Sequence, residues 1–570
     1  MKINKLLVAV AVSAVLVGCD DDDTTVVNVE CGEGSVLNTE TNVCEVVPVE
    51  PPPAVECGEG TVLNTDTNTC EMIPPTGAVD FYNSDNWAES FPDQHASWAK
   101  TEENTPDEGV TDLLEENPNL VVTWAGYGFA KDYNRARGHH FALTDVISSL
   151  RTGSPMIVDG VVQGEAMAAS CWSCKSPDLA RMYDEIGEAN FTDNSWSTWG
   201  HEMANTIGCA DCHELGEDQL RLSRPYTERA MTTVGLTFGA QDATEQGSQV
   251  CAQCHVEYYF DGTDHKKVKY PWDFWVPGVK TDYASQAGYA GDDGLYDGFS
   301  AEAQLAYFDS IGFKDWTNAI SGAPSLKTQH PEYENLADRT SHVMSGHLDF
   351  SCVTCHMPKS TNDDGVEYSN HNVRFDAARL PSSCQGCHNP DTFETILSGR
   401  KDEIKALRFG ANGTDARLTE LHFKAQAIWS ANGVEGLKEG KTIGEAKASY
   451  EGALKAGNEL AGEMNSLLTK IRNAQWFWDS ATASHGIHAH NKAEAVRLLE
   501  KSNGIIDAAL VEADALLAKY APDYVFDITA VDTKAEAQPL AGLDLEKMKT
   551  DKAKFISERV EKEWPHELKK

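Results

Sequence analysis

Five cysteine pairs with the spacing CxxC constrain the fold of this chain more than any other feature of its sequence. Four pairs are followed directly by histidine: Cys209/Cys212/His213, Cys251/Cys254/His255, Cys352/Cys355/His356 and Cys384/Cys387/His388. The fifth pair, Cys171 and Cys174, is followed by Lys175. In a CxxCH motif the cysteines form thioethers to a haem, and the histidine is an axial ligand of its iron. The pattern predicts five covalent c-type haems, one of them with a different task.

Zinc is the main alternative, because paired CxxC motifs also build four-cysteine zinc sites. Histidine accounts for only 18 of the 570 residues, so its presence after four of five pairs is rarely a matter of chance. Zinc knuckles need no histidine at that position. The histidines therefore favour haem over zinc.

Lys175 replaces the expected histidine in the first pair. An ammonium has no lone pair to give to iron, so this lysine must lose its proton, which burial and the metal charge both favour. If the opposite face of this haem has no protein ligand, its iron is open to a substrate. The alternative is a conventional motif that has lost its histidine.

Charge and composition exclude some functions. A hydrophobic content of 41% supplies a substantial core, whereas a formal net charge of −42 argues against binding nucleic acid, whose phosphates would be repelled. The 15 cysteines divide without remainder into Cys19, four in a repeated segment and the ten of the pairs. Covalent haem attachment and disulfides both call for an exported protein.

The beginning of the chain has the form of a secretory signal. Lys2 and Lys5 precede a mostly apolar run that is too short to span a bilayer, and the run ends in the letters LVGC. Those letters resemble a bacterial lipobox, which predicts cleavage before Cys19 and lipid on its sulfur. The alternative is an ordinary signal peptide with a chance cysteine.

A tandem repeat follows the signal, with VECGEGSVLNTETNVCE recurring 26 residues later as VECGEGTVLNTDTNTCE. The spacing within each copy predicts one disulfide per repeat, Cys31–Cys44 and Cys57–Cys70. A proline-rich stretch joins the copies. We expect a stalk between membrane and enzyme; a partner-binding role for the repeats is the alternative.

The second half of the chain predicts long helices. Between Pro390 and Pro522 there is no proline, and apolar residues recur at helical spacing. Three glycines, Gly452, Gly457 and Gly462, weaken the pattern. A last charged helix is expected at about residues 543–563.

Several further stretches accompany the cysteine pairs: CWSCK, CAQCHVEYYF, QHPEYE, TWAGYGFAKDYNRARGHHFALTDV, LRTGSP, CHMPK, NAQWFWD and ASHGIHAH. With them the chain, from about Ala88 onward, resembles the pentahaem cytochrome c nitrite reductases, which reduce nitrite to ammonium. The resemblance implies a pocket above the first haem containing Arg151, Tyr258 and His330, with Lys175 as proximal ligand. These residue types suit an anion whose N–O bonds are broken with proton delivery.

The resemblance also implies a calcium ion beside the pocket. Its ligands would be the side chains of Glu257 and Gln329 and the carbonyls of Tyr258 and Lys327. Hard oxygen donors of this kind suit calcium. The ion would hold the two loops that carry Tyr258 and His330, and would add positive field to a pocket that must attract an anion.

Distal haem ligands follow from the same resemblance. They are His371 for the second haem, His139 for the third and His490 for the fourth. For the fifth haem the resemblance favours His342, with His347 as the alternative. His139 is followed directly by His140, and motif alignment selects the first of the two.

The resemblance implies partners as well: nitrite, a second copy of the chain, and a quinol-oxidising multihaem membrane cytochrome or a soluble multihaem electron donor. One rival is a reductase acting chiefly on hydroxylamine or sulfite on the same scaffold. Another is a pure electron carrier with five six-coordinate haems. The lipobox and the repeat lie outside the usual soluble form of the family, and they predict a lipid-anchored location on the periplasmic side of a bacterial membrane.

Together these expectations describe a mainly α multihaem cytochrome c with little sheet. The expected segments are a signal peptide at 1–18, a stalk at 19–78, a pentahaem catalytic region at 79–395, long helices forming a dimer interface at 396–521, and a tail packing back on the domain at 522–570.

Overall fold

The computed structural model of this chain describes residues 35–38, 43–46, 61–64, 69–72, 79–104, 111–158, 161–163, 167–272, 299–337, 351–379, 389–409, 412–438 and 441–565. Its contacts divide the chain into two units, Met1–Ala78 and Val79–Lys570. Several predicted residues lie outside the described ones: the signal peptide with Cys19, then Cys31, Cys57, His342, His347, Cys384, Cys387 and His388.

The first unit contains two β-hairpins with the same register. Strand β1 (Ser35–Asn38) pairs with β2 (Val43–Val46), and β3 (Thr61–Asn64) pairs with β4 (Thr69–Met72), both antiparallel. Leu37 lies opposite Cys44 in the first hairpin as Leu63 lies opposite Cys70 in the second. The sequence repeat is therefore a repeated hairpin, and its two disulfides stay predictions because Cys31 and Cys57 are not described.

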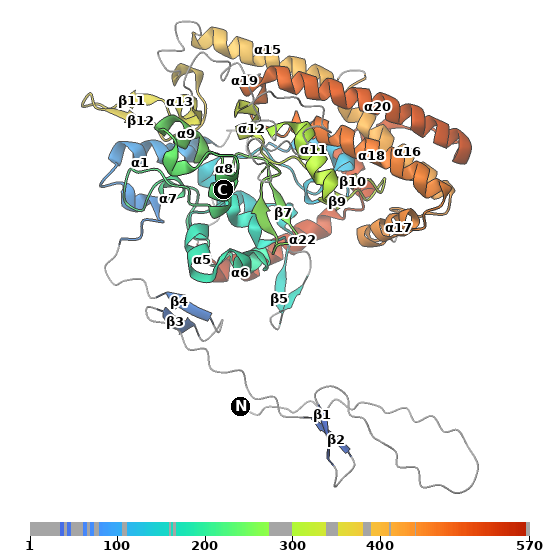
Figure 1. The fold of residues 1–570 in the computed structure, drawn as a ribbon, viewed down its shortest axis with the longest axis horizontal. Coiled ribbons are helices and arrows are strands. Elements are labelled where there is room, and N and C mark those ends of the chain that lie inside the picture. Colours follow the sequence, from blue (N-terminus) through green and yellow to red (C-terminus); the bar gives the residue numbers. More distant parts are fainter. Residues whose placement is uncertain are drawn as a thin grey trace. The chain divides into compact units, whose positions relative to one another are not determined.

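Short helices and hairpins make up the first part of the second unit (Figure 1). The helices are α1 (Pro92–Ala99), α2 (Leu113–Glu116), α3 (Asn119–Thr123), α4 (Ala142–Ser148), α5 (Asp178–Ile186), α6 (Glu188–Thr192), α7 (Cys209–Cys212), α8 (Pro225–Thr233), α9 (Ala243–Gln249), α11 (Ala301–Ser310), α12 (Glu332–Ala337) and α13 (Cys352–His356). The antiparallel hairpins are β5–β6 (Met156–Val158, Val161–Gln163), β7–β8 (Tyr259–Asp261, Lys267–Lys269), β9–β10 (Trp316–Thr317, Pro324–Ser325) and β11–β12 (Lys359–Thr361, Glu367–Ser369).

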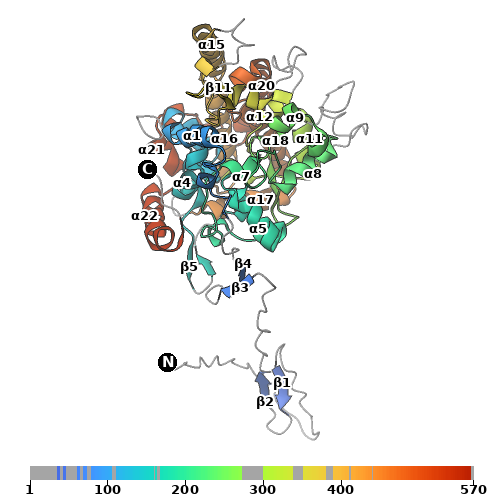
Figure 2. The same cartoon turned by 90° about the vertical axis from the view of Figure 1, so that its left-hand side faces the viewer.

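Longer helices form the rest of this unit. They are α15 (Pro390–Phe409), α16 (Thr414–Ala431), α17 (Ile443–Lys455), α18 (Glu459–Ser480), α19 (Ile487–His490), α20 (Lys492–Tyr520), α21 (Lys534–Leu540) and α22 (Leu545–Phe555), which continues through a π-helical turn (Ile556–Val560) into α23 (Glu561–Glu563). Helices α16, α18 and α20 pack against one another, as Figures 1 and 2 show. The predicted mainly α fold, with small sheets and long C-terminal helices, is confirmed.

One of the three glycines ends a helix. Gly457 adopts φ +64° between α17 and α18, a left-handed conformation that favours glycine. Gly462 instead lies inside α18, in open space where an added Cβ would meet nothing. Two of the expected long helices, α17 and α18, are therefore joined at Gly457.

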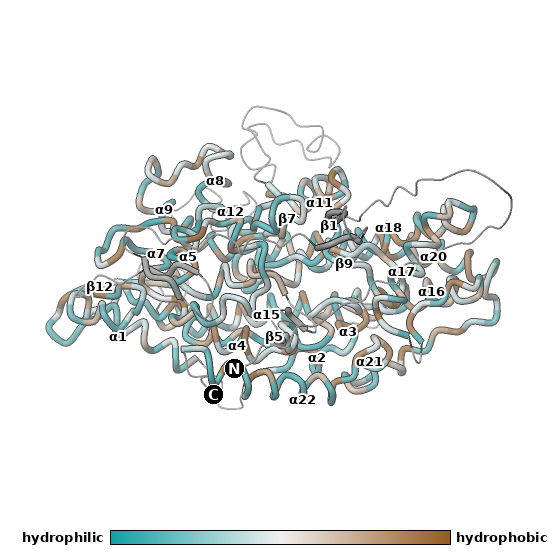
Figure 3. The backbone as a smooth tube through the Cα atoms, turned by 90° about the horizontal axis from the view of Figure 1, so that it is seen from below, coloured by the Kyte–Doolittle hydropathy of each residue, from teal (hydrophilic) through white to brown (hydrophobic). Residues whose placement is uncertain are grey.

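Two hydrophobic cores support the second unit. The larger joins α16, α18 and α20 to residues 114–130 and 301–326. The smaller is built mainly from residues 143–272 and is completed by Phe555, Val560 and Trp564 from the end of the described chain. Figure 3 shows polar and apolar positions alternating along α22, as expected for a helix with one buried face.

Trp564 closes the smaller core at a point where two segments of the chain approach closely. Its ring lies 5.4 Å from that of Trp196 and 6.2 Å from that of Trp172, measured between ring centres. A Cβ on Gly200 would come within 2.1 Å of the Trp564 ring, so only glycine fits there. The end of the described chain thus packs directly behind the CWSCK stretch.

A search of the described residues for membrane-spanning helices found none with the necessary length and apolarity.

Candidate active site

The lysine-bearing pair lies on a 3₁₀ helix, Ala169–Cys174, which we call the first attachment segment together with Lys175. Trp172 within it is fully buried, and its indole N–H donates to the carbonyl of Trp196 at 2.7 Å. The backbone N–H of Lys175 donates to the Trp172 carbonyl at 3.0 Å. Trp172 therefore anchors the segment, leaving the two cysteines and the lysine at its other side.

The motif cysteines that the structure describes are free. Cys171, Cys174, Cys209, Cys212, Cys251, Cys254 and Cys352 form no disulfide and are partly accessible. Burial nevertheless raises the pKa of Cys171 and of Cys212 to about 12. Free, partly accessible cysteines in CxxC pairs fit covalent attachment of haems.

Cys355 completes the fourth pair of the chain. It lies on α13 between Cys352 and His356, one helical turn after Cys352, and it is partly accessible like the other described motif cysteines. The helix therefore presents both cysteines of this pair next to the histidine that follows them. Thioether formation at Cys355, as at the other described motif cysteines, stays a prediction.

Hydrogen bonds between thiols show which CxxC pairs lie side by side. A hydrogen bond from Cys254 is the largest cause that lowers the pKa of Cys174, to about 6. Another thiol hydrogen bond joins Cys251 and Cys352. The first segment therefore lies beside the third CxxC pair of the chain, and the third lies beside the fourth.

In each of two histidine pairs, the two rings are spaced as the axial ligands of one iron atom would be. The ring centres of His213 and His371 are 6.1 Å apart, and those of His356 and His490 are 6.2 Å apart. Metal–imidazole bonds of about 2 Å, with the radius of each ring added, put two such rings about 6 Å apart. The two members of each pair were expected to bind the same haem, and the spacing within each pair fits a haem between them.

His255 has two histidines near it. Its charge contributes to lowering the pKa of His139, which burial brings to about 4. The ring of His330 lies 6.1 Å from that of His255. His330 thus stands at the ring spacing of the two axial pairs, whereas His139 is linked to His255 only through the charge that acts on its pKa. His139 as the axial partner of His255 stays a prediction.

Arg151 lies on a 3₁₀ turn, Leu150–Thr152, close to the first attachment segment. Its backbone N–H and its Nε both donate to Ser149 Oγ, at 3.1 and 3.2 Å. Ser149 in turn donates to a carboxylate oxygen of Asp132 at 2.9 Å. The guanidinium packs over the Phe129 ring at 4.6 Å, and its charge acts on the thiol of Cys171. Arg151 is thus held in place next to the first pair.

Tyr258 borders the same segment from the β7 side. Burial is the main cause that raises the pKa of its hydroxyl, and the neighbouring thiols of Cys174 and Cys171 raise it further. Tyr127 acts on the same hydroxyl. The phenol is therefore protonated and available as a hydrogen-bond donor at neutral pH.

His330 approaches from the loop before α12. Burial lowers the pKa of its ring to about 3, and Lys175, His255 and His485 are among the charges that act on it. Its side chain is nevertheless 37% exposed. The His485 ring stacks on it at 5.6 Å. Three residues predicted from three places in the sequence thus lie around the first attachment segment, which carries the fourth, Lys175.

The loops expected to hold calcium are in contact. The carboxylate of Glu257, 1% exposed, accepts a hydrogen bond from the backbone N–H of Gln329 at 2.6 Å. The side-chain amide of Gln329 donates to the carbonyl of Lys327 at 3.2 Å. Burial raises the pKa of Glu257 well above its ordinary value, so a cation there would stabilise its ionised form. Glu257, Gln329 and the Lys327 carbonyl fit a calcium ion.

A metal site built mainly from His, Cys, Asp or Glu side chains is absent from the part of the chain that the structure describes. Those residues contain no group of three or more His, Cys, Asp or Glu side chains placed to hold a metal. The expected calcium set does not need one, because Glu257 is its single carboxylate.

Sequence reasoning missed the residue that holds the His330 loop. Asp479, the last residue of NAQWFWD, is 1% exposed and accepts from Lys327 Nζ and from the backbone N–H of Thr328, both at 3.0 Å. The Lys327 backbone N–H donates to Asp315 at 2.9 Å, and burial raises the pKa of Asp315 to about 7. The motif that contains Asp479 was visible in the sequence, but its role was not.

Lys552 supports the Arg151 loop from α22 and was also missed. Its Nζ donates to Thr152 Oγ1 and to the Gly153 carbonyl, both at 2.8 Å. Burial lowers its pKa to about 7. A charged lysine is therefore disfavoured at this position, whereas the neutral amine keeps both hydrogen bonds.

Replacing Lys552 by methionine is expected to remove a pH dependence of stability. Between pH 7 and about 10.5 the unfolded chain holds a proton on Lys552 that the folded chain lacks, so stability rises with pH there, by at most about 1.4 kcal/mol per pH unit. Below pH 7 both states are protonated and this contribution is constant. Thermal unfolding at pH 7 and pH 9.5 should show the wild type gaining more than Lys552→Met; equal gains would contradict this origin.

Comparison with known proteins gives two findings. A family model described as cytochrome c552 matches residues 83–570. Among solved structures, the catalytic subunit of cytochrome c nitrite reductase from Desulfovibrio desulfuricans ATCC 27774, described with two calcium sites, has a similar fold. The TM-score is 0.60 at 22% sequence identity, over 83% of this chain and 91% of that one. At this identity the second likeness concerns the fold alone.

Proposed function

The chain belongs to the cytochrome c552 family, and from this premise we propose that it reduces nitrite to ammonium at a haem attached to Cys171 and Cys174. The observation that carries the proposal is the convergence of Arg151, Tyr258 and His330 on the first attachment segment. A solved structure with the same fold is a cytochrome c nitrite reductase, which supports the same activity.

The proposed cofactors are five haems c and one calcium ion. Lys175 is the proposed proximal ligand of the first haem; the ring spacings support His213 with His371 and His356 with His490 as axial pairs. The remaining proposed axial ligands are His255 with His139, and His388 with His342 or, alternatively, His347.

When bound, the first haem supplies the iron that binds nitrite and the electrons that reduce it. The overall change is NO₂⁻ + 6 e⁻ + 8 H⁺ → NH₄⁺ + 2 H₂O. Arg151 holds the anionic oxygens through its fork of N–H donors, which are already oriented by Ser149. Phe129, under the guanidinium, keeps water from that side of it.

Protons come from the other two pocket residues. The His330 ring is neutral at pH 7 because burial lowers its pKa to about 3, and an anion bound beside it raises that pKa again. His330 therefore takes up a proton when nitrite is present and passes it to an oxygen that is leaving as water. Tyr258 donates a hydrogen bond from its protonated hydroxyl.

Calcium would keep the two proton-donating loops together. It would be held by Glu257 and Gln329 with the carbonyls of Tyr258 and Lys327, and its charge would favour an anion in the pocket. Removing it with a chelator is expected to lower nitrite turnover at least about tenfold, since positioned groups lose rate when they shift.

Elemental analysis before and after chelation gives a reading that does not depend on turnover. One calcium per chain should disappear, and added Ca²⁺ should restore both the metal and the rate, whereas Mg²⁺ should not, because it needs a smaller octahedral site. A protein that contains no calcium as purified would contradict the assignment.

We further propose that the chain is exported, carries lipid on Cys19 and lies on the periplasmic side of a bacterial membrane. The repeats would then form a stalk, with disulfides Cys31–Cys44 and Cys57–Cys70. The long C-terminal helices would join two copies. Electrons would come from a quinol-oxidising multihaem membrane cytochrome or a soluble multihaem donor.

The deciding experiment combines product analysis with spectroscopy. Purified protein given nitrite and a reduced donor should form ammonium quantitatively, with hydroxylamine and sulfite as comparison substrates. Its spectrum should contain one high-spin haem that changes when nitrite is added. A protein with no high-spin haem, or with one that ignores nitrite, would be an electron carrier instead.

A further inference from the structure

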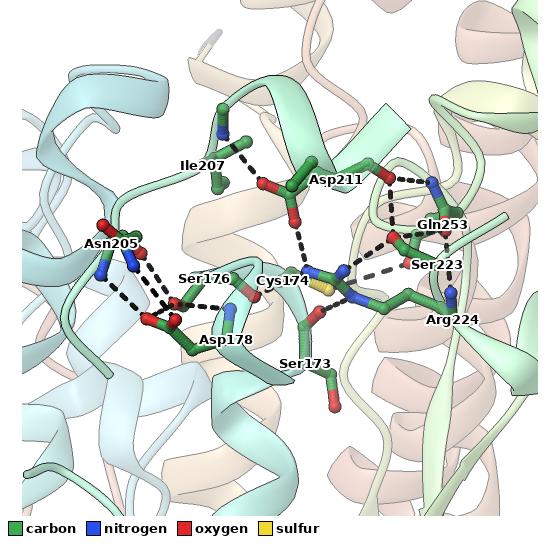
Figure 4. A network of polar contacts seen from close by, with 12 residues as sticks. Ser173, Cys174, Ser176, Asp178, Asn205, Ile207, Asp211, Ser223, Arg224 and Gln253 are labelled. Carbon is green, nitrogen blue, oxygen red and sulfur yellow. Dashed lines mark hydrogen bonds and ion pairs between the residues drawn. The ribbon is translucent and has the colours of Figure 1, made fainter. Parts of the chain in front are cut away.

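Arg224 is 1% exposed, directly before α8, and the proposed mechanism does not use it. Its Nε donates to the carbonyl of Ser173 at 2.9 Å, and one terminal nitrogen donates to the carbonyl of Ser176, also at 2.9 Å (Figure 4). These two carbonyls lie on either side of Cys174 and Lys175. One planar guanidinium therefore binds the backbone immediately before Cys174 and immediately after Lys175.

A guanidinium suits this task because its donors are fixed in one plane. Neither carbonyl can turn without breaking a bond to the same rigid group, so the peptide that carries Lys175 has one orientation. Ser176 is held a second time, since its hydroxyl donates to the Asn205 carbonyl at 2.6 Å and its Oγ accepts from the backbone N–H of Asp178 at 3.2 Å. The backbone on which Lys175 stands is thus fixed at both ends.

Arg224 also ties this segment to the second CxxC pair. The nitrogen that binds Ser176 donates to a carboxylate oxygen of Asp211 at 2.6 Å. Asp211 lies between Cys209 and Cys212 in α7, and its other oxygen accepts from the backbone N–H of Gly208 at 2.8 Å. The positive charge near Lys175 is therefore balanced by the second attachment segment.

The third CxxC pair joins through Gln253, which lies between Cys251 and Cys254. Its carbonyl oxygen accepts from the backbone N–H of Arg224 at 2.9 Å, and its amide donates to the backbone carbonyl of Asp211 at 3.0 Å. Figure 4 shows Arg224, Asp211 and Gln253 meeting at one point. Three attachment segments that are far apart in the sequence share this single junction.

We propose that Arg224 is a positioning residue that directs Lys175 to the iron of the first haem and sets the register of the first three attachment segments. Burying an ion pair contributes little to stability by itself, because desolvation offsets the attraction. Because Arg224 donates hydrogen bonds on both sides of Lys175, the Arg224–Asp211 ion pair has a geometric role instead. This inference rests on the proposed role of Lys175 as proximal ligand.

Arg224→Lys separates geometry from charge. Lysine retains a positive charge near Asp211 but cannot bridge the two carbonyls in one plane. We expect five covalent haems by mass, an altered high-spin signal of the first haem, and kcat for nitrite at least tenfold lower with KM changed less than twofold. Arg181→Lys, which disturbs an arginine paired with Glu185 and Glu202 on α5, is the matched control and should leave spectrum and kcat unchanged.

Asp211→Asn is the second variant, because it loosens the guanidinium while leaving both of its carbonyl bonds. It should move the high-spin signal in the same direction, by less. An unchanged signal and a kcat within twofold of wild type in Arg224→Lys would overturn the proposal; if that variant fails to attach its haems, an unchanged signal in Asp211→Asn would overturn it. Failure of the proposed function is distinguishable, because the wild type would then show no lysine-ligated high-spin haem.

Discussion

Replacing His330 by alanine is expected to lower nitrite turnover by about 10²- to 10⁴-fold, the range in which a positioned general acid contributes. Lys175 is among the charges that act on the ring, and burial lowers the pKa of the ring to about 3, so the ring is neutral until a bound anion raises that pKa. The loss should appear mainly in kcat, because binding of nitrite to iron and to Arg151 does not need the imidazole. Steady-state turnover, with haem content determined by mass, checks the result.

A control for this variant is His201→Ala. His201 is paired with Glu202 and is 38% exposed, so its loss should leave turnover unchanged. His330→Gln keeps one hydrogen-bond donor without a titratable nitrogen, and it should recover only a small part of the rate. Near-normal turnover in His330→Ala with five haems attached would remove His330 from the mechanism.

Replacing Arg151 by alanine is expected to lower kcat/KM for nitrite by about 10²- to 10³-fold, the loss measured when a preorganised anion-stabilising donor is removed. Arg151→Lys should recover part of this, because lysine retains the charge but not the two-pronged geometry. KM should rise in both variants, since the guanidinium holds the substrate itself.

The paired reading for Arg151 is the affinity of the high-spin haem for nitrite, measured by the spectral change without turnover. It should weaken in Arg151→Ala and stay unchanged in Arg181→Ala, whose arginine lies on α5. If affinity and turnover in Arg151→Ala match the wild type, Arg151 has no part in binding the anion.

Local motifs explain how much of the site could be predicted from the sequence. Haem attachment depends on residues within five positions of each other, so the pairs were visible directly. The long helices followed from spacing and from the absence of proline, and little sheet was expected of a chain that builds its core around five haems. Gly457 and Gly462 looked alike in sequence; they differ because only Gly457 has a positive φ, which depends on where α18 must begin to pack.

The supporting residues could not be predicted because their partners are distant in sequence. Arg224 and Lys552 stand alone in their stretches, with no spacing to mark them, and the visible stretch NAQWFWD did not show what its Asp479 does. Each acts through backbone groups, such as the carbonyl of Ser173 or the N–H of Thr328, which every residue possesses. Trp172 looked like an arbitrary residue between two cysteines, whereas it is the buried anchor of the segment.

The packing of α22 behind the first attachment segment sets an order in time. Lys552 and Thr152 are 400 residues apart in the chain, and Trp564 closes over Trp172 from still further along. Until those late residues have emerged, the first segment lacks the wall behind it. The wall behind Cys171 and Cys174 is therefore completed only after nearly the whole second unit has been synthesised.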